Sequence, residues 1–256
     1  MYFPSFIHIY QIASAVPILD FKVVAEEIEK ILPRCNIDIR PPFNYEEKMI
    51  EHAKISDIKQ PFEKQKNHKK DNTMTTADTT ISPYDGFVMQ KKLAELIPIS
   101  EISLDHIHII FTSLFTCTFS EDDWRYHARA VICGTPSIVS TTGIVEALAK
   151  PREFYLAQLC ESMTEDNDVL KKRFAGRFID YGDEDKITAA SINYSLQAIF
   201  FFITHGQPFC SDKDCRLFNA HWQEELIHII RKRTLCSHHR NLANNLLKDQ
   251  SKTPRF

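Results

Sequence analysis

The sequence predicts an α/β (α+β) fold, in which helices pack on a mixed sheet. Three observations support this fold class. The chain opens with a β-α-β pattern, residues 106–112 form an apolar run that suits a buried central strand, and 43% of the 256 residues are hydrophobic. A chain of this length and composition can bury a large core, so we expect residues 1–256 to form a single domain.

The first third of the chain predicts the opening β-α-β unit. Residues 6–12 alternate in polarity and are rich in β-forming side chains, and Asp20 is typical of the cap of the helix that follows. Residues 37–39 then predict a short strand, and residues 45–58 form an amphipathic stretch. Residues 59–80 contain few apolar side chains, so we predict a disordered surface insertion there.

The middle of the chain predicts most of the remaining sheet. A helix is expected at residues 91–97, before the central strand at 106–112. Residues 114–119 are predicted to be its hairpin partner, and further strands are expected at 128–133 and 137–141.

Two histidines stand on one face of the predicted central strand. His106 and His108 are two residues apart, and side chains in a strand alternate between its faces. Such a pair could ligate a metal ion. Because no third ligand is near in the sequence, we favour histidines held by hydrogen bonds at the polar edge of the strand.

The C-terminal half predicts mainly helices. We expect amphipathic helices at residues 153–161 and 166–178, and a long helix at 188–205 that Gly206 closes as a left-handed cap. Residues 247–256 carry few large apolar groups, so they are predicted to be a frayed tail.

The charge balance and the cysteine count limit the classes of partner. The chain has 31 Lys and Arg against 34 Asp and Glu, and its formal charge is -3. No overall field would attract nucleic acid or an anionic membrane, so we expect neither partner. An odd count of seven cysteines, with no apolar run near eighteen residues and no leader, predicts a cytoplasmic protein in a reducing compartment.

Four potential metal ligands lie in two pairs near the C-terminus. Four residues separate Cys210 from Cys215, and two residues separate Cys236 from His239. Zinc favours tetrahedral coordination by thiolate and imidazole, and two short chelating turns bring such ligands together at little entropic cost. We predict a structural Zn²⁺ site of Cys3His type, with His238 as the rival fourth ligand. The alternative is that these cysteines are ordinary buried side chains.

This cluster and the residues before it resemble the signature of the archaemetzincins. That family carries HExxHxxGxxHC, four residues, CxM, and a later CxxC. In the present chain the same order is kept by Gly206, Cys210, Cys215 and Cys236. Leu217 stands where the signature has Met, and His239 replaces the last Cys. Over residues 100–240, the resemblance implies a metzincin-like mixed sheet, a zinc metallopeptidase ancestry, and a structural zinc site beside the catalytic one.

The catalytic positions that the resemblance implies are all apolar. The two helical histidines would fall at Ile199 and Ile203, the general base at Phe200, and the third histidine at Phe209. Peptide hydrolysis by zinc needs side chains that donate lone pairs to the ion, an open coordination position and a general base. The hydrocarbon side chains of isoleucine and phenylalanine can neither ligate zinc nor accept a proton. We therefore predict no catalytic residues and a pseudoenzyme. The expected function is a zinc-stabilised peptide-binding or regulatory module, with a peptide or protein as partner.

Relocated ligands would instead make the chain an active metallopeptidase. His221, Glu225 and His228 have helical offsets of four and three, which would place them on one face of a helix. Tridentate binding over that span is strained, so we favour a solvated amphipathic helix. The pair on the central strand is the other source of relocated ligands.

A further polar cluster could bind a carboxylate. Arg125, His127 and Arg129 alternate along one predicted strand face, where they could bind an acidic group or a peptide C-terminus. A turn in which Asp122 and Asp123 pair with these cations is the simpler interpretation.

Overall fold

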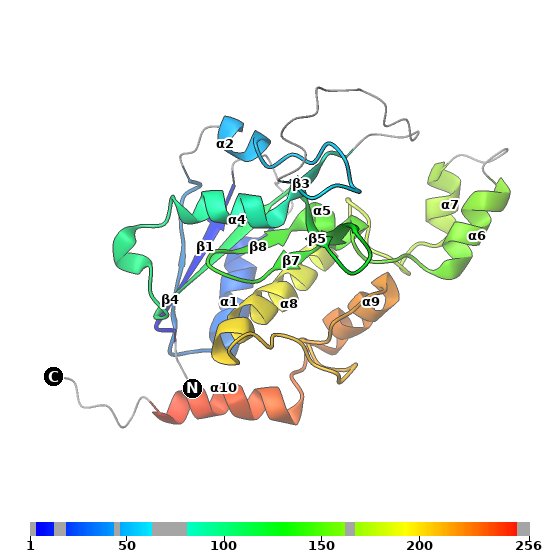
Figure 1. The fold of residues 1–256 in the computed structure, drawn as a ribbon. Coiled ribbons are helices and arrows are strands. Elements are labelled where there is room, and N and C mark those ends of the chain that lie inside the picture. The colour runs from blue at the N-terminus through cyan, green and yellow to red at the C-terminus, as the bar shows by residue number, and fades with distance from the viewer. Residues whose placement is uncertain (1–3, 13–18, 44–46, 63–80, 162–166, 250–256) are drawn as a thin grey trace.

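The protein is built on a five-stranded sheet with helices on both faces (Figure 1). The computed structural model describes residues 4–12, 19–43, 47–62, 81–161 and 167–249. The strand order is β2-β1-β4-β8-β7, and every pair is parallel except β7 with β8. The strands, in that order, are β2 (Asn36–Ile39), β1 (Phe6–Gln11), β4 (His106–Thr112), β8 (Ser137–Ser140) and β7 (Val131–Ile132). The predicted α/β class is confirmed.

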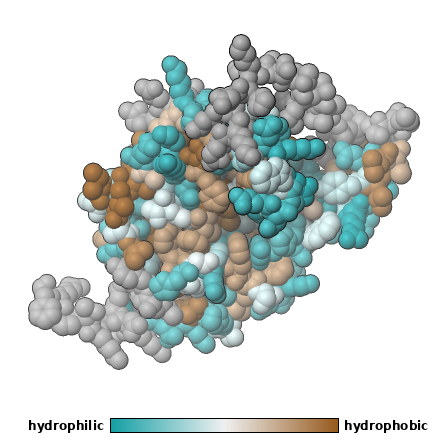
Figure 2. Space-filling model, in the orientation of Figure 1, coloured by the Kyte–Doolittle hydropathy of each residue, from teal (hydrophilic) through white to brown (hydrophobic). Residues whose placement is uncertain are grey.

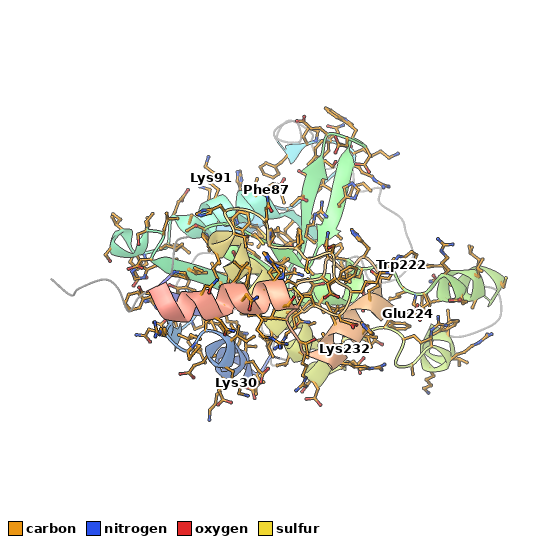
Figure 3. All side chains as sticks on the ribbon, turned by 90° about the horizontal axis from the view of Figure 1, so that it is seen from below. Lys30, Phe87, Lys91, Trp222, Glu224 and Lys232 are labelled. Carbon is orange, nitrogen blue, oxygen red and sulfur yellow. The ribbon has the colours of Figure 1, made fainter. Side chains whose placement is uncertain are left out.

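Alternation along β1 and β4 sends side chains to two separate cores. Ile7, Ile9 and Ile107 face one side, whereas Tyr10 and Ile110 face the other. On the first side pack α1 and α8, and on the second pack α2 and α4. The bounds of these helices are α1 (Phe21–Ile31), α2 (Glu47–Glu51), α4 (Gly86–Ala94) and α8 (Glu184–Ile203). Viewed from below, Lys30 of α1 and Lys91 of α4 point outward on opposite sides of the molecule (Figure 3).

A second, three-stranded sheet corrects one predicted pairing. Its order is β3-β5-β6, formed by β3 (Pro83–Asp85), β5 (Phe115–Ser120) and β6 (Arg125–Arg129). The prediction that residues 114–119 pair with the central strand is wrong, because β1 and β8 already occupy both edges of β4. The chain turns away after Thr112, whose hydroxyl accepts a hydrogen bond from the amide of Leu114 at 3.1 Å.

The strand predicted at 128–133 is divided between the two sheets. β6 ends at Arg129 and pairs with β5, whereas β7 begins at Val131 and pairs with β8. α5 (Thr141–Glu146) packs against this crossing. A Cβ on Gly143 would lie 2.2 Å from the carbonyl oxygen of Arg129, so only glycine allows the two backbones to approach this closely.

Several helix boundaries also differ from the predictions. α4 begins at Gly86 rather than near residue 91, because the Asp85 side chain caps the amides of Phe87 and Val88, each at 3.0 Å. The helix predicted at 166–178 is shorter, and the amphipathic stretch at 45–58 yields only the short α2. The remaining helices are α6 (Arg152–Glu161), α7 (Asn167–Arg173), α9 (Gln223–Lys232) and α10 (Ser237–Asp249).

Two predicted disordered segments fall largely outside the described residues. Of the insertion predicted at 59–80, residues 63–80 lie outside, as do residues 250–256 of the tail predicted at 247–256. α10 continues to Asp249 and so includes the first three residues of the predicted tail. Leu242 and Ala243 pack this helix on the core, which supports it beyond the point where the apolar pattern fades.

The visible surface is mostly polar, with apolar side chains gathered over the connection between α4 and β4 (Figure 2). Ile99, Ile102 and Leu104 are the exposed apolar residues of this connection. Among the described helices, none combines the length and the apolarity needed to cross a bilayer.

Candidate metal centre

Two short segments bring the four predicted ligands together. Cys210 and Cys215 lie on the loop between α8 and α9, whereas Cys236 directly precedes α10 and His239 lies in its first turn. Their donor atoms all lie within 4.8 Å of one another, and we call these four residues the thiolate cluster. Backbone bonds fold the loop into this shape. The amide of Cys210 donates to the Leu217 carbonyl at 2.8 Å.

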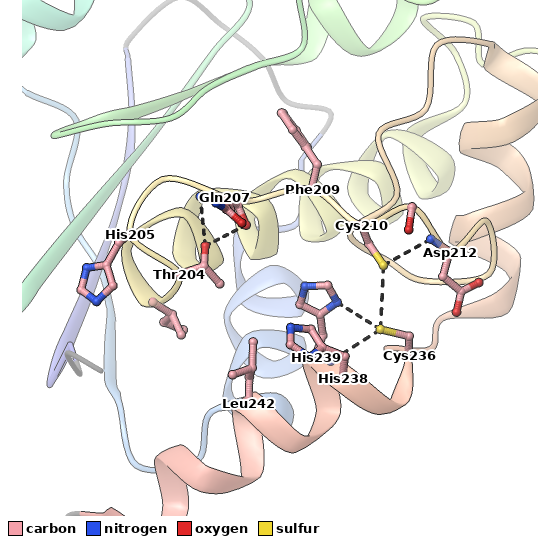
Figure 4. A pocket seen from close by; sticks show the side chains of 12 residues that line it. Thr204, His205, Gln207, Phe209, Cys210, Asp212, Cys236, His238, His239 and Leu242 are labelled. Atoms are coloured by element: carbon pink, nitrogen blue, oxygen red, sulfur yellow. Dashed lines mark hydrogen bonds between the residues drawn. The ribbon is translucent and has the colours of Figure 1, made fainter.

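The spacing within the thiolate cluster fits a tetrahedral zinc ion, and Figure 4 shows three of its members, Cys210, Cys236 and His239, close together. The sulfurs of Cys210 and Cys236 are 3.8 Å apart, and Nδ1 of His239 lies 3.8 Å from the sulfur of Cys215 and 3.1 Å from that of Cys236. Zinc–sulfur bonds of ~2.3 Å imply tetrahedral edges of about 3.8 Å. The four donors therefore fit the ion with little rearrangement.

Backbone amides surround the sulfurs and would support their negative charge. The amides of Asp212 and Cys236 donate to the sulfurs of Cys210 and Cys215, both at 3.4 Å. Burial raises the pKa of the Cys215 thiol to about 12 and lowers the pKa of His239. The imidazole is thus neutral, as ligation requires, and the thiols release protons when a metal binds.

The geometry distinguishes the two adjacent histidines. His239 is buried and points its Nδ1 at the sulfurs, with its ring edge-on to Phe200. His238 is exposed, and its ring lies beside that of His239. The ring of His239 is therefore the one placed to complete the Cys3His set.

The three positions of the catalytic motif that fall on α8 are buried in the core, whereas the fourth is not. Ile199 and Phe200 are fully buried on α8, and Ile203 is 1% exposed. We call these three residues the filled helix centre. Phe209 is 47% exposed and lines the cavity of about 720 Å³ beside the thiolate cluster. Within the described ranges, no group of potential metal ligands includes α8.

Gly206 keeps the role that its place in the signature implies. Its φ is +100°, and its amide donates to the Phe201 carbonyl at 2.8 Å, which ends α8. The chain then turns toward Cys210. Leu217, at the Met position of the signature, is fully buried in the main core.

Residues 4–246 match the family described as "Probable metallopeptidase family (DUF6775)". The chain belongs to this family. The match covers nearly the whole chain and includes the filled helix centre and the thiolate cluster. No functionally curated protein matches the chain.

Solved structures place this DUF6775 protein in a known fold. A zinc-dependent peptidase from Methanocorpusculum labreanum (strain Z) aligns with a TM-score of 0.50 at 13% identity, over 93% of this chain and 100% of that one. Archaemetzincin from Methanopyrus kandleri aligns with a TM-score of 0.48 at 10% identity, over 96% of each chain. The predicted metallopeptidase family is confirmed, and the fold is similar to that of the zinc-dependent peptidase.

In this DUF6775 protein, the alternative ligands His221, Glu225 and His228 serve other contacts. The prediction that all three share a helix is wrong, because α9 begins at Gln223. The Glu225 carboxylate accepts from the amides of His221 and Trp222 at 2.9 and 3.1 Å, which caps the helix. His228 pairs with Asp214 at 2.5 Å.

The histidine pair of the central strand has partners that the sequence did not reveal. His106 and His108 share the α4 face of β4, as predicted. Nδ1 of His108 faces the Tyr10 hydroxyl at 3.0 Å, and Nδ1 of His106 faces Nε2 of His8 at 2.8 Å. Burial lowers the pKa of His108 to about 4, so its ring is neutral near pH 7. Two strands 98 residues apart form this cluster, which spacing within either strand could not indicate.

Of the predicted carboxylate-binding residues, Arg129 lines a groove, whereas Arg125 and His127 form ion pairs. Asp123 pairs with Arg125 at 2.7 Å and with His127 at 2.8 Å, as the charge-paired turn predicts. Hydrogen bonding from His127 lowers the pKa of Asp123 to about 2. Arg129 instead donates from Nε to the Thr118 hydroxyl at 2.8 Å.

A groove of about 460 Å³ runs beside β7, and we call it the strand-edge groove. Its lining includes Arg129, Val131, Gln197, Phe201, Phe209 and His221. Gln197 is 2% exposed, and its Nε2 donates to the Phe218 carbonyl at 3.1 Å. Its Oε1 has no partner among the described residues. A buried acceptor without a partner is costly, and the residue that carries this one lines the groove.

Proposed function

We propose that this chain is a non-hydrolytic member of its family, a peptide-binding module stabilised by zinc in the thiolate cluster. The observation that carries the proposal is the filled helix centre, where carbon occupies every position of the motif on α8. Isoleucine and phenylalanine offer no lone pair to a metal and no base to a water molecule. All three side chains are buried, and their packing contributes to the core.

The fit of the thiolate cluster supports a structural role for zinc. Four protein ligands close a tetrahedral ion, whereas catalytic zinc keeps one position open. The cluster ties the loop after α8 to the start of α10, beside the backbone hydrogen bond from Arg216 to Thr234 at 2.8 Å. A zinc ion there would contribute directly to the stability of the C-terminal third.

The strand-edge groove supports a peptide as the ligand. β7 is the last strand of the main sheet, and an extended peptide can add to such an edge through its backbone. Gln197 Oε1 would accept a hydrogen bond from a peptide amide, and the exposed face of Phe209 would contact an apolar side chain. Arg129 at the groove wall would pair with a carboxylate, including that of a peptide C-terminus.

Incubation of the zinc-loaded protein with a pool of peptides tests this proposal. We expect mass spectrometry to find peptides bound and none cleaved. Phe209→Ala should weaken binding about tenfold without loss of stability, because a half-exposed ring contributes about 1–2 kcal/mol to contact. Ile99→Ala, which removes an exposed side chain far from the groove, is the matched control.

The same experiment tests the alternative function, an active metallopeptidase with relocated ligands. The observation in its favour is that His106 lies with His8 and Glu101, two imidazoles and a carboxylate. Peptide cleavage that a chelator stops and that His106→Ala abolishes would establish this alternative. It would also refute the non-hydrolytic proposal.

A further inference from the structure

A second cluster of potential metal ligands lies across the main sheet from the thiolate cluster. His8 of β1 and His106 of β4 face the α4 side, and Glu101 ends the 3₁₀ turn η1 (Ile99–Glu101) before β4. Cys215 packs instead in the core on the α1 and α8 side. The sheet separates the two clusters, so they cannot share an ion.

The geometry of this cluster is close to that of a bound cation. One donor atom from each of His8, His106 and Glu101 lies within 4.8 Å of the other two. Nε2 of His8 is 2.8 Å from Nδ1 of His106 and 3.9 Å from a carboxylate oxygen of Glu101. Zinc bonds of ~2.1 Å to nitrogen and oxygen imply donor separations of about 3.4 Å. His106 and Glu101 are only partly buried, so small movements would reach this spacing.

Hydrogen bonding determines which nitrogen of His8 faces the cluster. Its Nδ1 lies 2.5 Å from the Asp38 carboxylate, which only accepts hydrogen bonds. Nδ1 therefore carries the proton, and Nε2 presents its lone pair to His106. A carboxylate behind a ligating imidazole is the usual support of a metal-binding histidine. His106 now donates from Nδ1, and it would bind a metal by carrying its proton on Nε2 instead.

Two neighbouring residues hold Glu101 in place without joining the donor set. His108 donates from Nε2 to the Glu101 carbonyl at 3.2 Å, while its Nδ1 accepts from the Tyr10 hydroxyl. Arg40 donates to both carboxylate oxygens of Glu101 at 2.6 and 2.9 Å. The carboxylate is thus anchored through its own backbone and through a guanidinium, so little entropy remains to be lost when it binds an ion.

The charged side chains around this cluster have a net negative charge, which favours a cation. Asp38 and Glu101 carry two negative charges, and Arg40 contacts both of them with a single positive charge. With neutral histidines, the group has a net charge of one negative unit in a partly buried position. A divalent ion beside the two carboxylates would compensate this charge.

We propose that His8, His106 and Glu101 form a second metal site, which binds a divalent ion such as Zn²⁺ or Co²⁺. Two imidazoles and one carboxylate suit these ions, whereas Mg²⁺ and Ca²⁺ prefer oxygen alone. Three protein ligands leave a coordination position for water or another ligand on the half-buried side. The site shares no residue with the strand-edge groove and does not depend on peptide binding.

Cobalt titration of the full chain tests this site. One equivalent of Zn²⁺ first fills the thiolate cluster, and Co²⁺ is then added. We expect one further equivalent to bind, with visible absorption that lacks the charge-transfer band of a thiolate ligand. His106→Ala and Glu101→Gln should each weaken the second binding about 100-fold or more, and Asp38→Asn should weaken it about 10- to 100-fold.

His52→Ala is the matched control, since His52 is exposed and belongs to neither cluster. It should bind cobalt as the native chain does. Circular dichroism confirms that each variant is folded, and Glu101→Gln carries the test if His106→Ala does not fold. Absence of a second cobalt equivalent, a thiolate band on that equivalent, or equal affinity in the Glu101→Gln variant would overturn the proposal. Peptide binding by the Phe209→Ala variant is measured in a separate experiment, so either the peptide-binding proposal or the second metal site can be refuted without the other.

Discussion

Two neighbouring stretches of the chain differ sharply in the side chains that they carry. The filled helix centre, residues 199–203, has carbon where the family resemblance places a catalytic metal and its base. The thiolate cluster begins seven residues later at Cys210 and keeps four donors at zinc spacing. Apolar packing can replace a metal that only performs chemistry, because a filled core is stable by itself. An ion that joins two separate segments contributes its binding free energy to folding, which apolar side chains on one segment cannot supply.

Loss of the thiolate cluster should have the largest effect. We expect Cys215→Ser to abolish zinc retention and to lower the free energy of unfolding by several kcal/mol. The total free energy of unfolding of a typical protein is only ~5–15 kcal/mol, so this loss would be large. Metal analysis and denaturant unfolding measure the two effects. Cys160→Ser, at an exposed cysteine outside the cluster, should change neither. Equal stability of the two variants would contradict a structural role for the metal.

A cavity in the filled helix centre should have the next largest effect. Phe200→Ala removes a fully buried ring and should cost about 3–5 kcal/mol, while zinc content stays the same. Phe209→Ala, at another position of the motif, is 47% exposed and should cost less than about 1 kcal/mol. Urea unfolding of the pair separates core packing from surface contact. A Phe200 variant as stable as the native chain would mean that this position is not packed as described.

Alkaline pH should have a smaller effect through Tyr194 on the same helix. Burial raises the pKa of Tyr194 above its usual value. Above pH ~10 the unfolded chain ionises this phenol while the folded chain keeps it protonated, so the free energy of unfolding falls as pH rises. At pH 11 the loss should be about 1 kcal/mol, and Tyr194→Phe should lack it. Unfolding curves of both proteins at pH 8 and pH 11 provide the comparison, and parallel losses would argue against burial of this phenol.

Replacement of His205, the histidine closest to the filled helix centre in sequence, should have the smallest effect. His205 is exposed after the end of α8, with a φ of 54°. We expect His205→Ala to change the free energy of unfolding by about 0.5 kcal/mol or less and to leave zinc content and peptide binding unchanged. Loss of zinc or of peptide binding in this variant would show that His205 contributes to one of the two sites.

The sequence predicted those features that depend on local spacing. The thiolate cluster was predictable because each pair of ligands chelates within one turn, and β4 because seven consecutive residues suit a buried strand. The apolar positions on α8 followed from counting back from Gly206. In each case the deciding residues are close together in the chain, so pattern and structure coincide.

Features that depend on distant pairing were not predictable. The sequence predicts that β5 pairs with β4, but local alternation does not specify which strand lies beside which. The contact of His106 with His8 depends on the parallel register of β1 with β4. His221 was placed on a helix because its spacing suits one, whereas Glu225 caps the helix after that residue. At the start of a helix, a residue can either cap the helix or extend it by another turn, and tertiary contacts decide which of the two occurs.

Anomalous X-ray diffraction at the zinc edge, from crystals of the purified protein, tests the central claim most directly. We predict a zinc peak bonded to the sulfurs of Cys210, Cys215 and Cys236 at about 2.3 Å, with His239 as the fourth ligand. No peak should lie beside Ile199 and Ile203. A water-ligated ion next to α8, or a thiolate cluster with no metal in protein that retains full stability, would contradict the account.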